Sequence, residues 1–580
     1  MPQARSPYDV SLTAEDKKTL GLWLQKEMQA ALDAKTAQDS EVDYWHTIYE
    51  QGRTRLARNL PWPDAADLTS YLGTEKTDAL HARLMRTIWS EPVYQVEGWG
   101  ESADRAPYVE EFHQWKAEEE RLQGVLDRLA LISLIEPRGL LEIYEATERR
   151  VTRKTIKAKL QLDPLTGGPM FGADMKPLMQ QDGEEYLEAG PDEPAADVVV
   201  DSDELIRTGP QYRIVPYRDS VILPGHARDR DEIFGYGKRF WRRVPELQAK
   251  AAAKVYDKDV VEQLTTTAER ESDAALQRSH QSVAVQEGAT AEKELWELQI
   301  LMDCQALIGK KPQGERFYLV TFHLGQGLIL RIQHDDVGQR YLPVILFPRP
   351  DRVTEGFSLI GHKLVTTIEE HTAWRNMIAD RASMKAQAPL KRLENALWQP
   401  DEQAFGPKAV INVRDMNEVQ QMELEDVPQS LVQREQSMER TAERIAGVND
   451  VASGQTSVQD RTLGEIQMAT EQSFVRMDLI VRRFQEFMED LGQVRHTIWK
   501  RALASQPRGM DVPQSVSSGL DARGVSLPDG KMTAALLEGT FRFKPRGSVE
   551  TADPNRLRQD FVQMIGMLPN LLQGFPSLAI

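Results

Sequence analysis

The chain has 580 residues, enough for several domains or for one elongated subunit that packs against copies of itself. Its formal net charge of -18 disfavours a protein that grips nucleic acid by neutralising phosphates, because such proteins gather Lys and Arg on the contact face. The single cysteine, Cys304, excludes an intramolecular disulfide and a cysteine-based zinc site, and we expect it to be a small buried side chain. No apolar run approaches the roughly 18 residues of a membrane span, so we expect no membrane segment.

The first part of the chain is predicted to be helical. Residues 11–58 carry apolar side chains at helical spacing, with Ser11 or Thr13 as a possible cap. A proline-rich stretch interrupts this pattern, and Asp67 or Thr69 can cap a second helix beyond it. These features predict two helices joined by an extended turn.

Strands and helices then alternate up to an acidic segment. Residues 93–99 alternate like a strand, and residues 108–135 return to a long helical pattern. Residues 138–163 predict two strands joined by a charged turn. Residues 173–204 are rich in Asp and Glu with scattered Gly and Pro, which indicates a solvated surface insertion.

The middle of the chain predicts a sheet. Short strands are expected within residues 211–225, followed by a helical stretch over residues 229–286. Four β-like runs within residues 294–350 are separated by Gly, Pro and charged turns. We expect these four runs to form a meander in one sheet.

The last third is dominated by three helices. Residues 356–388 predict one long helix, and residues 428–446 a second helix that is polar on nearly every side. Between the second and a third helix lies a Gly/Ser/Asn-rich loop, which is either functional or a disordered linker. The third helix carries seven apolar residues with alternating spacings of three and four, which predicts a packed stripe: Met477, Ile480, Phe484, Phe487, Leu491, Val494 and Ile498. A strand and a helix are expected in the tail.

No pattern of residues predicts catalysis or a cofactor. The sequence lacks a nucleotide-binding P-loop and a His-Glu-x-x-His zinc motif, and its ten histidines are scattered singly. Ser358 lies in a near miss for a nucleophile elbow, and we expect it near a helix N-terminus instead. We therefore expect no catalytic residue, no metal and no cofactor. A hydrolase or nuclease that uses an unrecognised carboxylate pair remains an alternative.

Three local clusters of basic residues stand out on this acidic chain. Such clusters are more often ion-pairing faces than DNA contacts, and both interpretations stay open at this point. The clusters are Arg53, Arg55 and Arg58; Arg149, Arg150, Arg153, Lys154, Lys157 and Lys159; and Lys238, Arg239, Arg242 and Arg243.

The order of these segments resembles the portal proteins of tailed bacteriophages, in particular the large podovirus-type portals. Four stretches carry the resemblance: LPWPDAADLTSYLGTEKTDAL with RLMRTIWSEPVYQVEGW; ELWELQ through LPVILFPRP; GFSLIGHKLVTTIEEHTAWRNMIADRASMKAQAP; and RIAGVNDVASGQ followed by TLGEIQ. Together they span most of residues 50–505. Each stretch alone has low specificity for the family, but the order and spacing of the four stretches are specific.

The resemblance implies an α+β, mainly helical portal fold in an elongated ring subunit. Its parts would be a wing, a stem, a clip, a tunnel loop and a partial crown. The implied boundaries are residues 1–355 for the wing; 356–388 and 428–446 for the two stem helices; 389–427 for the clip; 447–463 for the tunnel loop; 464–505 for a long wing helix; and 506–580 for a wing return and crown.

The resemblance also assigns roles to particular residues. Gly447, Val448, Val451, Gly454 and Val458 would belong to a DNA-facing tunnel loop, with the two glycines as hinges. The seven apolar residues of the third helix would make it a rigid strut behind that loop. Charged residues of the stem would meet neighbouring subunits: Arg375, Arg381, Arg434, Glu435, Arg440 and Glu443.

A portal of this family implies a set of partners and a location. The chain would form a homo-oligomeric ring of twelve subunits at one capsid vertex of the virion, after assembly in the host cytoplasm. Double-stranded DNA would pass through the ring during packaging and ejection. The other implied partners are the terminase large subunit, the scaffolding protein, the major capsid protein and the tail adaptor. Another head-tail connector ring is a further alternative.

Overall fold

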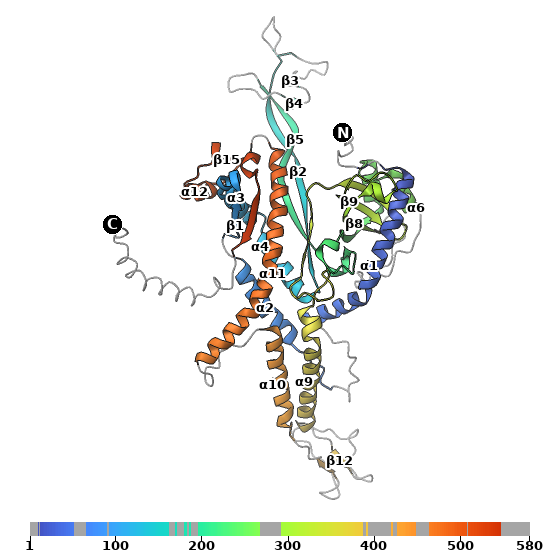
Figure 1. Cartoon of the computed structure of the whole chain (residues 1–580), viewed down its shortest axis with the longest axis vertical. Coiled ribbons are helices and arrows are strands. Elements are labelled where there is room, and N and C mark those ends of the chain that lie inside the picture. Colours follow the sequence, from blue (N-terminus) through green and yellow to red (C-terminus); the bar gives the residue numbers. More distant parts are fainter. Residues whose placement is uncertain are drawn as a thin grey trace, which may run out of the picture.

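The computed structural model describes a defined set of residues: 10, 12–51, 65–89, 92–161, 169–170, 179–182, 185–186, 195–266, 292–386, 390–392, 419–421, 426–447, 463–506 and 509–546. Within them the chain mixes helices and strands, as the sequence predicts. The molecule is elongated (Figure 1), with a β-hairpin at one end and a pair of helices at the other. The hairpin is β2 (Gly139–Lys159) with β5 (Ala195–Val215), and the helices are α9 (Val365–Ala386) and α10 (Gln429–Ala446).

Helix α1 (Ala14–Tyr49) joins two parts of the body. It begins with a capping box, in which Thr13 and Asp16 each accept a hydrogen bond from the other's backbone N–H. Its first half, with Leu20 and Leu24, packs on the larger sheet. Its second half, with Trp45 and Ile48, enters the main core. The predicted cap at Thr13 is therefore confirmed.

The larger sheet has five antiparallel strands in the order β10-β9-β8-β7-β6. Helix α1 covers one face of it, whereas α5 and α6 cover the other, so opposite faces of β8 contribute to different cores. The elements are β6 (Ser220–Leu223), β7 (Gly235–Arg243), α5 (Val244–Ala252), α6 (Lys258–Thr266), β8 (Glu292–Met302), β9 (Arg316–His323) and β10 (Leu328–His334).

Two sequence predictions fail in this region. Residues 235–243, predicted as helix, form strand β7 because they pair along their whole length with β8. The expected meander of four runs in one sheet is also wrong. Three runs form β8, β9 and β10, but the fourth, β11 (Tyr341–Val344), pairs with β2 in a different sheet.

The smaller sheet has the order β11-β2-β5 and contains the long hairpin. The sequence predicts two strands joined by a charged turn within residues 138–163. That prediction is wrong, because residues 139–159 are one continuous strand whose pairing with β5 is interrupted by a single register shift at Glu148 and Arg149. The last ten residues of the acidic segment, residues 195–204, belong to strand β5, while the surface insertion expected for residues 173–204 stays a prediction.

The main core lies where α2, α3, α4 and α11 meet the small β1–β16 sheet and the base of the hairpin. These elements are α2 (Leu72–Ile88), β1 (Tyr94–Gly98), α3 (Ala106–Glu119), α4 (Leu122–Ile135), α11 (Leu463–Ala504) and β16 (Phe541–Pro545). The expected helix over residues 108–135 is two helices, since Arg121 has a positive φ of 54°. Neither Asp67 nor Thr69 caps α2, which begins after Tyr71 without a side-chain cap.

The remaining described elements are short. The strands and α-helices among them are β3 (Gln181–Asp182), β4 (Glu185–Tyr186), α8 (Cys304–Leu307), β12 (Leu390–Arg392), β13 (Val419–Gln421), β14 (Met510–Asp511), α12 (Gln514–Ala522) and β15 (Lys531–Met532). Cys304, at the start of α8, is buried as predicted. The strand predicted in the tail is β16. The expected tail helix near Asp553 lies outside the described residues.

Candidate functional site: the helical stem and the helix behind it

The projecting helices begin at a tightly packed turn. A π-helical turn, Leu359–Leu364, leads into α9, and Ser358 caps it by accepting a hydrogen bond from the Gly361 N–H at 2.8 Å. Gly361 lies flat against Trp45, since a Cβ there would come within 1.9 Å of the indole ring. Ser358 therefore has the structural role predicted for it, near a helix N-terminus.

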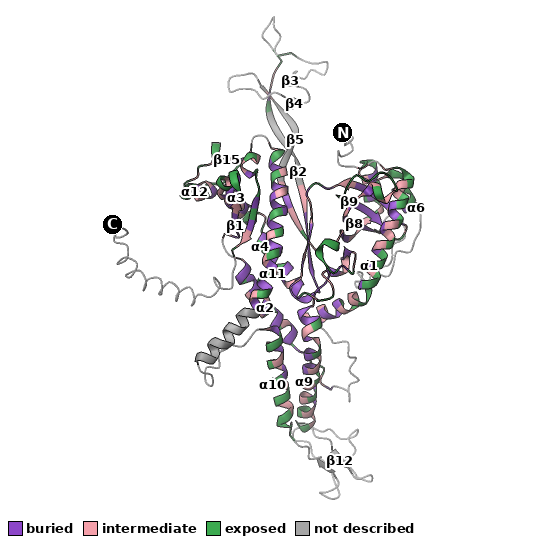
Figure 2. Cartoon of the chain, viewed as in Figure 1, coloured by how far each residue is buried: buried purple, intermediate pink, exposed green. Residues whose placement is uncertain are grey.

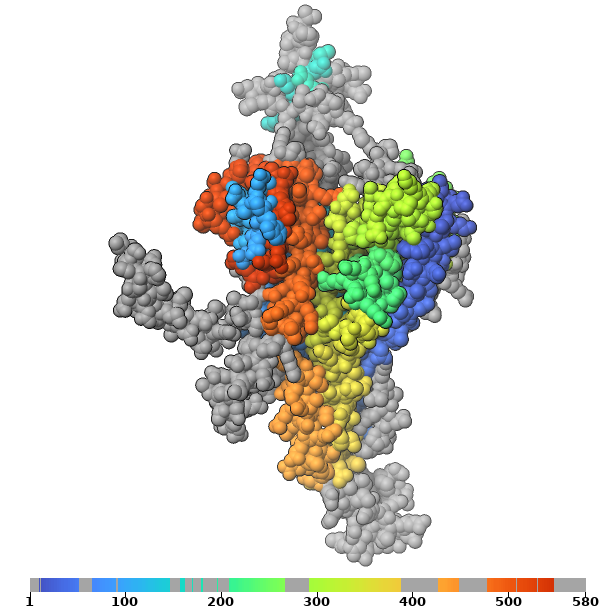
Figure 3. Space-filling model, in the orientation of Figure 1, coloured from blue at the N-terminus to red at the C-terminus, as the bar shows by residue number. Residues whose placement is uncertain are grey.

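Ion pairs join α9 to α10 along their exposed length. Arg434 lies 2.9 Å from Glu370, and Arg375 lies 3.7 Å from Glu435. Lys385 at the end of α9 pairs with Asp426 just before α10 at 2.6 Å, whereas His371 near the start of α9 lies 3.7 Å from Glu439 in the second half of α10. The two helices are therefore antiparallel, and Figure 3 shows them side by side. Because the ion pairs of Arg434, Arg375 and Lys385 are partly exposed, each contributes about 0–1 kcal/mol and mainly sets the relative position of the helices.

The charges that were predicted to meet neighbouring subunits are thus largely paired inside the chain. Glu443 of α10 lies 3.5 Å from Lys76 of α2. Arg381 is half-buried on α9. Arg440 is exposed, and no ion pair of it is recorded with the residues that the structure describes. It is therefore the clearest remaining candidate for a contact with another copy, and that role stays a prediction.

A short extended segment, residues 65–70, lies along α9 and is bound to it by a ladder of hydrogen bonds. We call this segment the strap. Alternate backbone N–H groups of the strap donate to polar side chains one helical turn apart on α9. The bonds are Ala66 N to Asp380 Oδ1 at 2.7 Å, Leu68 N to Asn376 Oδ1 at 2.7 Å, and Ser70 N to Thr372 Oγ1 at 3.2 Å.

The ladder explains why the outer half of α9 buries polar residues. Four residues of α-helix rise about 6 Å, and two residues of an extended chain span about 6.6 Å, so the two repeats match over a few rungs. Asn376 also donates to the Leu68 carbonyl at 3.0 Å. His371 is fully buried beside the ladder, where its Nδ1 meets the Ser70 hydroxyl at 2.8 Å. Burial lowers the pKa of His371, which favours the neutral ring.

Removing a rung should loosen the strap. Asn376→Ala removes the partners of the Leu68 N–H and C=O, and because Leu68 is 42% exposed and water can replace part of these bonds, we expect a loss of about 1 kcal/mol. We expect faster amide exchange at residues 66–70 and faster proteolysis there. Met377→Ala, at an exposed neighbour on the same helix, is the matched control and should leave exchange unchanged. Equal exchange in both variants would contradict the ladder.

Gly447 ends α10 in a left-handed conformation. Its φ is 72° and its N–H donates to the Glu443 carbonyl at 2.9 Å. Glycine suits this position because a side chain would strain the backbone. Val448, Val451, Gly454 and Val458 lie outside the described residues, so the predicted tunnel loop is described only at its first residue. Hinge and DNA-facing roles stay predictions.

The helix behind the loop, α11, is deeply embedded over the part whose burial is described (Figure 2). Its stripe residues are at most 8% exposed, and Phe484, Leu491 and Ile498 are fully buried. Gly492 packs against Phe543 of β16 so closely that a Cβ would come within 2.7 Å of it. The helix therefore contacts the β1–β16 sheet along one side. Its assignment as a mechanical strut stays a prediction.

A buried ion pair fastens α11 to the helical corner between α3 and α4. Arg495 is fully buried and lies 2.9 Å from Glu120, and its Nε donates to the Tyr212 hydroxyl at 2.7 Å. Trp499 Nε1 donates to the other Glu120 oxygen at 2.9 Å. Although burial opposes it, the Glu120 carboxylate raises the pKa of Arg495, so the guanidinium stays charged. The left-handed Arg121 places Glu120 at this corner.

A second buried polar pair lies on the same helix, where the His113 and His496 rings meet. His113 Nε2 lies 3.3 Å from His496 Nδ1, and Phe541 and Phe543 pack edge-on or tilted against these rings. Burial lowers the pKa of His113 well below its usual value and lowers the pKa of His496 to about 4. Both rings are therefore neutral at pH 7.

Acid should weaken the fold through this pair. An unfolded histidine binds a proton near pH ~6.5, whereas the buried His496 does so only near pH 4. Between these values the unfolded chain binds more protons, so the contribution of this pair to the free energy of unfolding falls as the pH drops from about 6.5 towards 4 and is constant above that window. Thermal melts should show a smaller fall for His496→Gln. The exposed His226→Gln is the control, and an unchanged slope in His496→Gln would contradict the assignment.

The basic clusters that the structure describes have acidic partners. Lys238 is buried and pairs with Glu142 and Glu297, and Arg239 pairs with Asp219 at 2.8 Å. Arg242 and Arg243 lie 3.3 Å and 3.6 Å from Glu246 and Glu292. In the hairpin, the backbone register places Arg150, Arg153 and Lys157 opposite Glu204, Asp201 and Asp197. The ion-pairing interpretation is confirmed for Lys238 to Arg243. Arg53, Arg55 and Arg58 lie outside the described residues.

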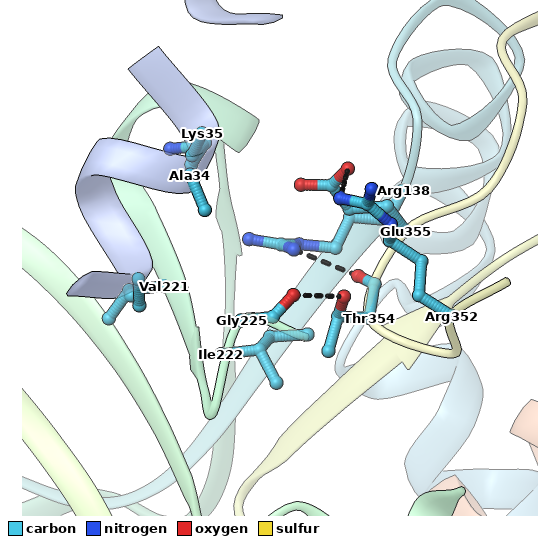
Figure 4. Close-up of a pocket in the computed structure, with 10 residues that line it drawn as sticks. Ala34, Lys35, Arg138, Val221, Ile222, Gly225, Arg352, Thr354 and Glu355 are labelled. Carbon is cyan, nitrogen blue, oxygen red and sulfur yellow. Dashed lines mark hydrogen bonds and ion pairs between the residues drawn. The ribbon is translucent and has the colours of Figure 1, made fainter. Parts of the chain in front are cut away.

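A small cavity lies where α1, β6 and the segment before α9 meet (Figure 4). Arg138 spans it and donates to the Thr354 carbonyl at 2.9 Å, while Thr354 donates to the Gly225 carbonyl at 3.0 Å. Burial lowers the pKa of the adjacent Lys35 to about 8. The enclosed space fits only about one water molecule. We interpret it as a structural joint and not as a binding site.

Among the residues that the structure describes, no group of three or more His, Cys, Asp and Glu is placed to hold a metal ion. None of the helices described there has the length and apolar character that a bilayer span requires.

Comparison with known protein families gives the class of the chain. A family model described as Phage SU10 portal protein matches residues 113–506. The chain therefore belongs to this family of phage portal proteins, which connect head to tail and act in DNA packaging. The match begins within α3, includes the hairpin, α9 and α10, and ends after α11. Searching curated proteins gives no match. The family is structural and not enzymatic.

The contacts that hold α9 and α11 in place were not predicted from the sequence. The strap ladder has a signal in the sequence, since Thr372, Asn376 and Asp380 are polar residues spaced by four on one helical face. That spacing indicates a polar partner for the face. The Glu120–Arg495 pair has no local signal, because its members are 375 positions apart.

Proposed function

We propose that the chain assembles into a homo-oligomeric ring of twelve subunits at one vertex of the capsid, and that double-stranded DNA passes through the ring during packaging and ejection. The observation that carries this proposal is the pair α9 and α10, which projects from the body as an antiparallel unit (Figure 1). In sequence this pair encloses the predicted clip, and the predicted tunnel loop follows it. The family match supports the same order.

The acidic charge suits a conduit. A wall rich in Lys and Arg would bind duplex DNA nonspecifically, with a dissociation constant of roughly 10⁻⁴–10⁻⁶ M, and would slow its passage. A chain of net charge -18 repels the phosphates instead. Three cations of α9 and α10, Arg375, Lys385 and Arg434, are already paired with acidic residues of the same chain, which leaves fewer to hold DNA.

The proposed division follows the family. Residues 1–355 form the wing, with residues 464–505 as its long helix. Residues 356–388 and 428–446 form the stem. The clip at residues 389–427 docks the terminase large subunit and later the tail adaptor. Scaffolding protein and major capsid protein contact the ring during head assembly in the host cytoplasm, and the finished ring is part of the virion. Residues 506–580 return to the wing and begin the crown.

Negative-stain microscopy and mass measurement of the purified full chain test the ring. We expect particles with a central hole and a mass near that of twelve subunits. A chain that stays monomeric and cleaves DNA in a metal-dependent manner would overturn the proposal and would favour the hydrolase or nuclease alternative. A ring with a different number of subunits would correct only the stoichiometry.

Replacing residues 451–459 by a Gly/Ser linker tests the loop. If the loop contacts DNA, we expect rings to assemble normally while packaging or retention of DNA decreases, because the change lies between α10 and α11 and not in a described core. Packaged DNA per particle is the measurement. A variant with the same residues in a different order is the control for length and composition. Normal packaging and retention in the linker variant would remove the loop's role.

A further inference from the structure

The β2–β5 hairpin extends far beyond the body. Its base is held by the main core, where Gly209 lies against Trp499 and the Tyr212 hydroxyl contacts Arg495. Beyond that point the two strands stay paired as far as Lys159 and Ala195. At about 3.3 Å per residue, residues 147–159 alone extend roughly 40 Å. Figure 1 shows this arm pointing away from α9 and α10, along the long axis of the molecule.

This arm has two backbone edges to which no described strand is added. Strand β11 pairs with β2 only from Gly139 to Glu142, and β5 has β2 as its one strand neighbour among the described elements. An isolated two-stranded ribbon is marginally stable in water, and an open edge is a template for pairing with another chain. Because the arm is long and both of its edges have unpaired backbone groups, we expect another strand to pair with it.

The two edges carry opposite charge. From residue 149 to 159, β2 contains six basic residues and no acidic one, whereas from residue 195 to 204, β5 contains four acidic residues and no basic one. The basic residues are Arg149, Arg150, Arg153, Lys154, Lys157 and Lys159, and the acidic ones are Asp197, Asp201, Asp203 and Glu204. A strand that pairs with the β5 edge should therefore be basic, and one that pairs with the β2 edge should be acidic.

We propose that the hairpins of neighbouring copies pair edge to edge, β2 of one copy with β5 of the next, so that one end of the ring is a closed antiparallel β-barrel. This inference rests on the proposed ring. Rotation about one axis brings different edges of neighbouring copies together, so a basic edge always meets an acidic edge. The strands of neighbouring copies are then antiparallel, as they are within the hairpin. Closure removes every open edge.

The size of such a barrel is compatible with a DNA conduit. Twelve hairpins supply about 24 strands, which at ~4.8 Å spacing give a circumference near 115 Å and a backbone diameter of about 37 Å. Strand tilt, typically about 35–45° in barrels, widens this further. The opening therefore exceeds the width of a DNA duplex. A second copy of this chain is the one partner whose edges supply both charges at once.

Disulfide trapping between two single-cysteine variants tests the pairing. Thr155→Cys lies in β2, and Asp197→Cys, Val199→Cys and Asp201→Cys sample three positions of β5 near the same height. Each β5 variant is co-assembled with Thr155→Cys in full-length rings and oxidised. Because each chain carries one new cysteine, and Cys304 is buried, a disulfide-linked dimer reports a contact between copies.

We expect dimers in at least one mixed assembly and none in Thr155→Cys alone, because two β2 strands would be separated by a β5 strand at roughly 10 Å. Rings that form without dimers in any mixture overturn the barrel and leave the proposed function intact. Dimers in Thr155→Cys alone also overturn it, since they report β2 beside β2. A chain that stays monomeric overturns both the barrel and the ring.

Hydrogen exchange on the unmodified protein gives an independent test. In a lone hairpin every second amide of residues 197–205 points away from β2 and exchanges fast, whereas in the barrel all of them are bonded. We expect uniform slow exchange across these amides in the purified ring. Fast exchange at alternate residues overturns the proposal, as does protection that develops only after scaffolding or capsid protein is added.

Discussion

Phe484→Asp is expected to abolish folding of the chain. The Phe484 side chain is fully buried at the centre of the main core, 5.3 Å ring to ring from Phe487. Losing a buried aromatic ring costs about 3–5 kcal/mol, and burying a carboxylate without a partner adds several more. The sum is comparable to the 5–15 kcal/mol that stabilises a typical domain. Soluble yield and circular dichroism measure the outcome.

The same helix supplies a matched control. Leu479 is 51% exposed on α11, so Leu479→Asp introduces the same charge into water and should leave the fold intact. Phe484→Leu keeps an apolar side chain and should give a folded but less stable protein, which makes the effect measurable if the aspartate variant yields no protein. A well-folded Phe484→Asp chain would contradict the packed stripe on α11.

Glu120→Ala should be the most damaging change among the polar residues. It leaves the fully buried Arg495 guanidinium without its anion, which typically costs about 3–5 kcal/mol. It also removes the acceptor of the Trp499 indole N–H. Urea denaturation of the full chain measures the loss. Glu118→Ala is the control, since Glu118 is exposed on α3 and its hydrogen bond from Gln114 is exposed too, so the change should alter stability by at most about 0.5 kcal/mol.

A double-mutant cycle separates the interaction energy between Glu120 and Arg495 from the cost of leaving one of these charges buried without a partner. Replacing a buried ion pair by apolar residues is often neutral or stabilising, so Glu120→Gln with Arg495→Met should recover much of the stability lost in either single variant. Glutamine keeps an acceptor for Trp499. Additive losses in the double variant would show that the two residues do not act as a pair.

Local patterns in the sequence were sufficient for the helices that determine the candidate site. The polar helix α10, the long helix α11 after it and the capping at Thr13 each follow from residues within a few positions of one another. The apolar stripe on α11 is predictable because all of its residues lie in one continuous segment with spacings of three and four. Gly447 is identifiable as a helix terminator for the same reason.

The failures share a physical cause, which is pairing between distant segments. Residues 235–243 adopt a strand because β8, beginning at Glu292, supplies a partner and because Glu142 and Glu297 neutralise the buried Lys238. The charged stretch of β2 is continuous because an acidic strand about 50 residues later lies opposite it. Neither partner is visible in a local window. The strap ladder is a similar case, joining residues 66–70 to residues 372–380.

The ladder between the strap and α9 fixes the position of this helix along the long axis of the subunit. Its two repeats differ by roughly 0.6 Å per rung, so they coincide for about three rungs and then lose alignment. A shift of α9 by one turn would bring Ile368 or Met384, which lack an oxygen acceptor, to one rung, so only the observed height satisfies all three hydrogen bonds. The strap therefore fixes the position of α9 along its axis relative to α2, which follows the strap in the chain. In an assembly of many copies, it would set every stem tip to the same level.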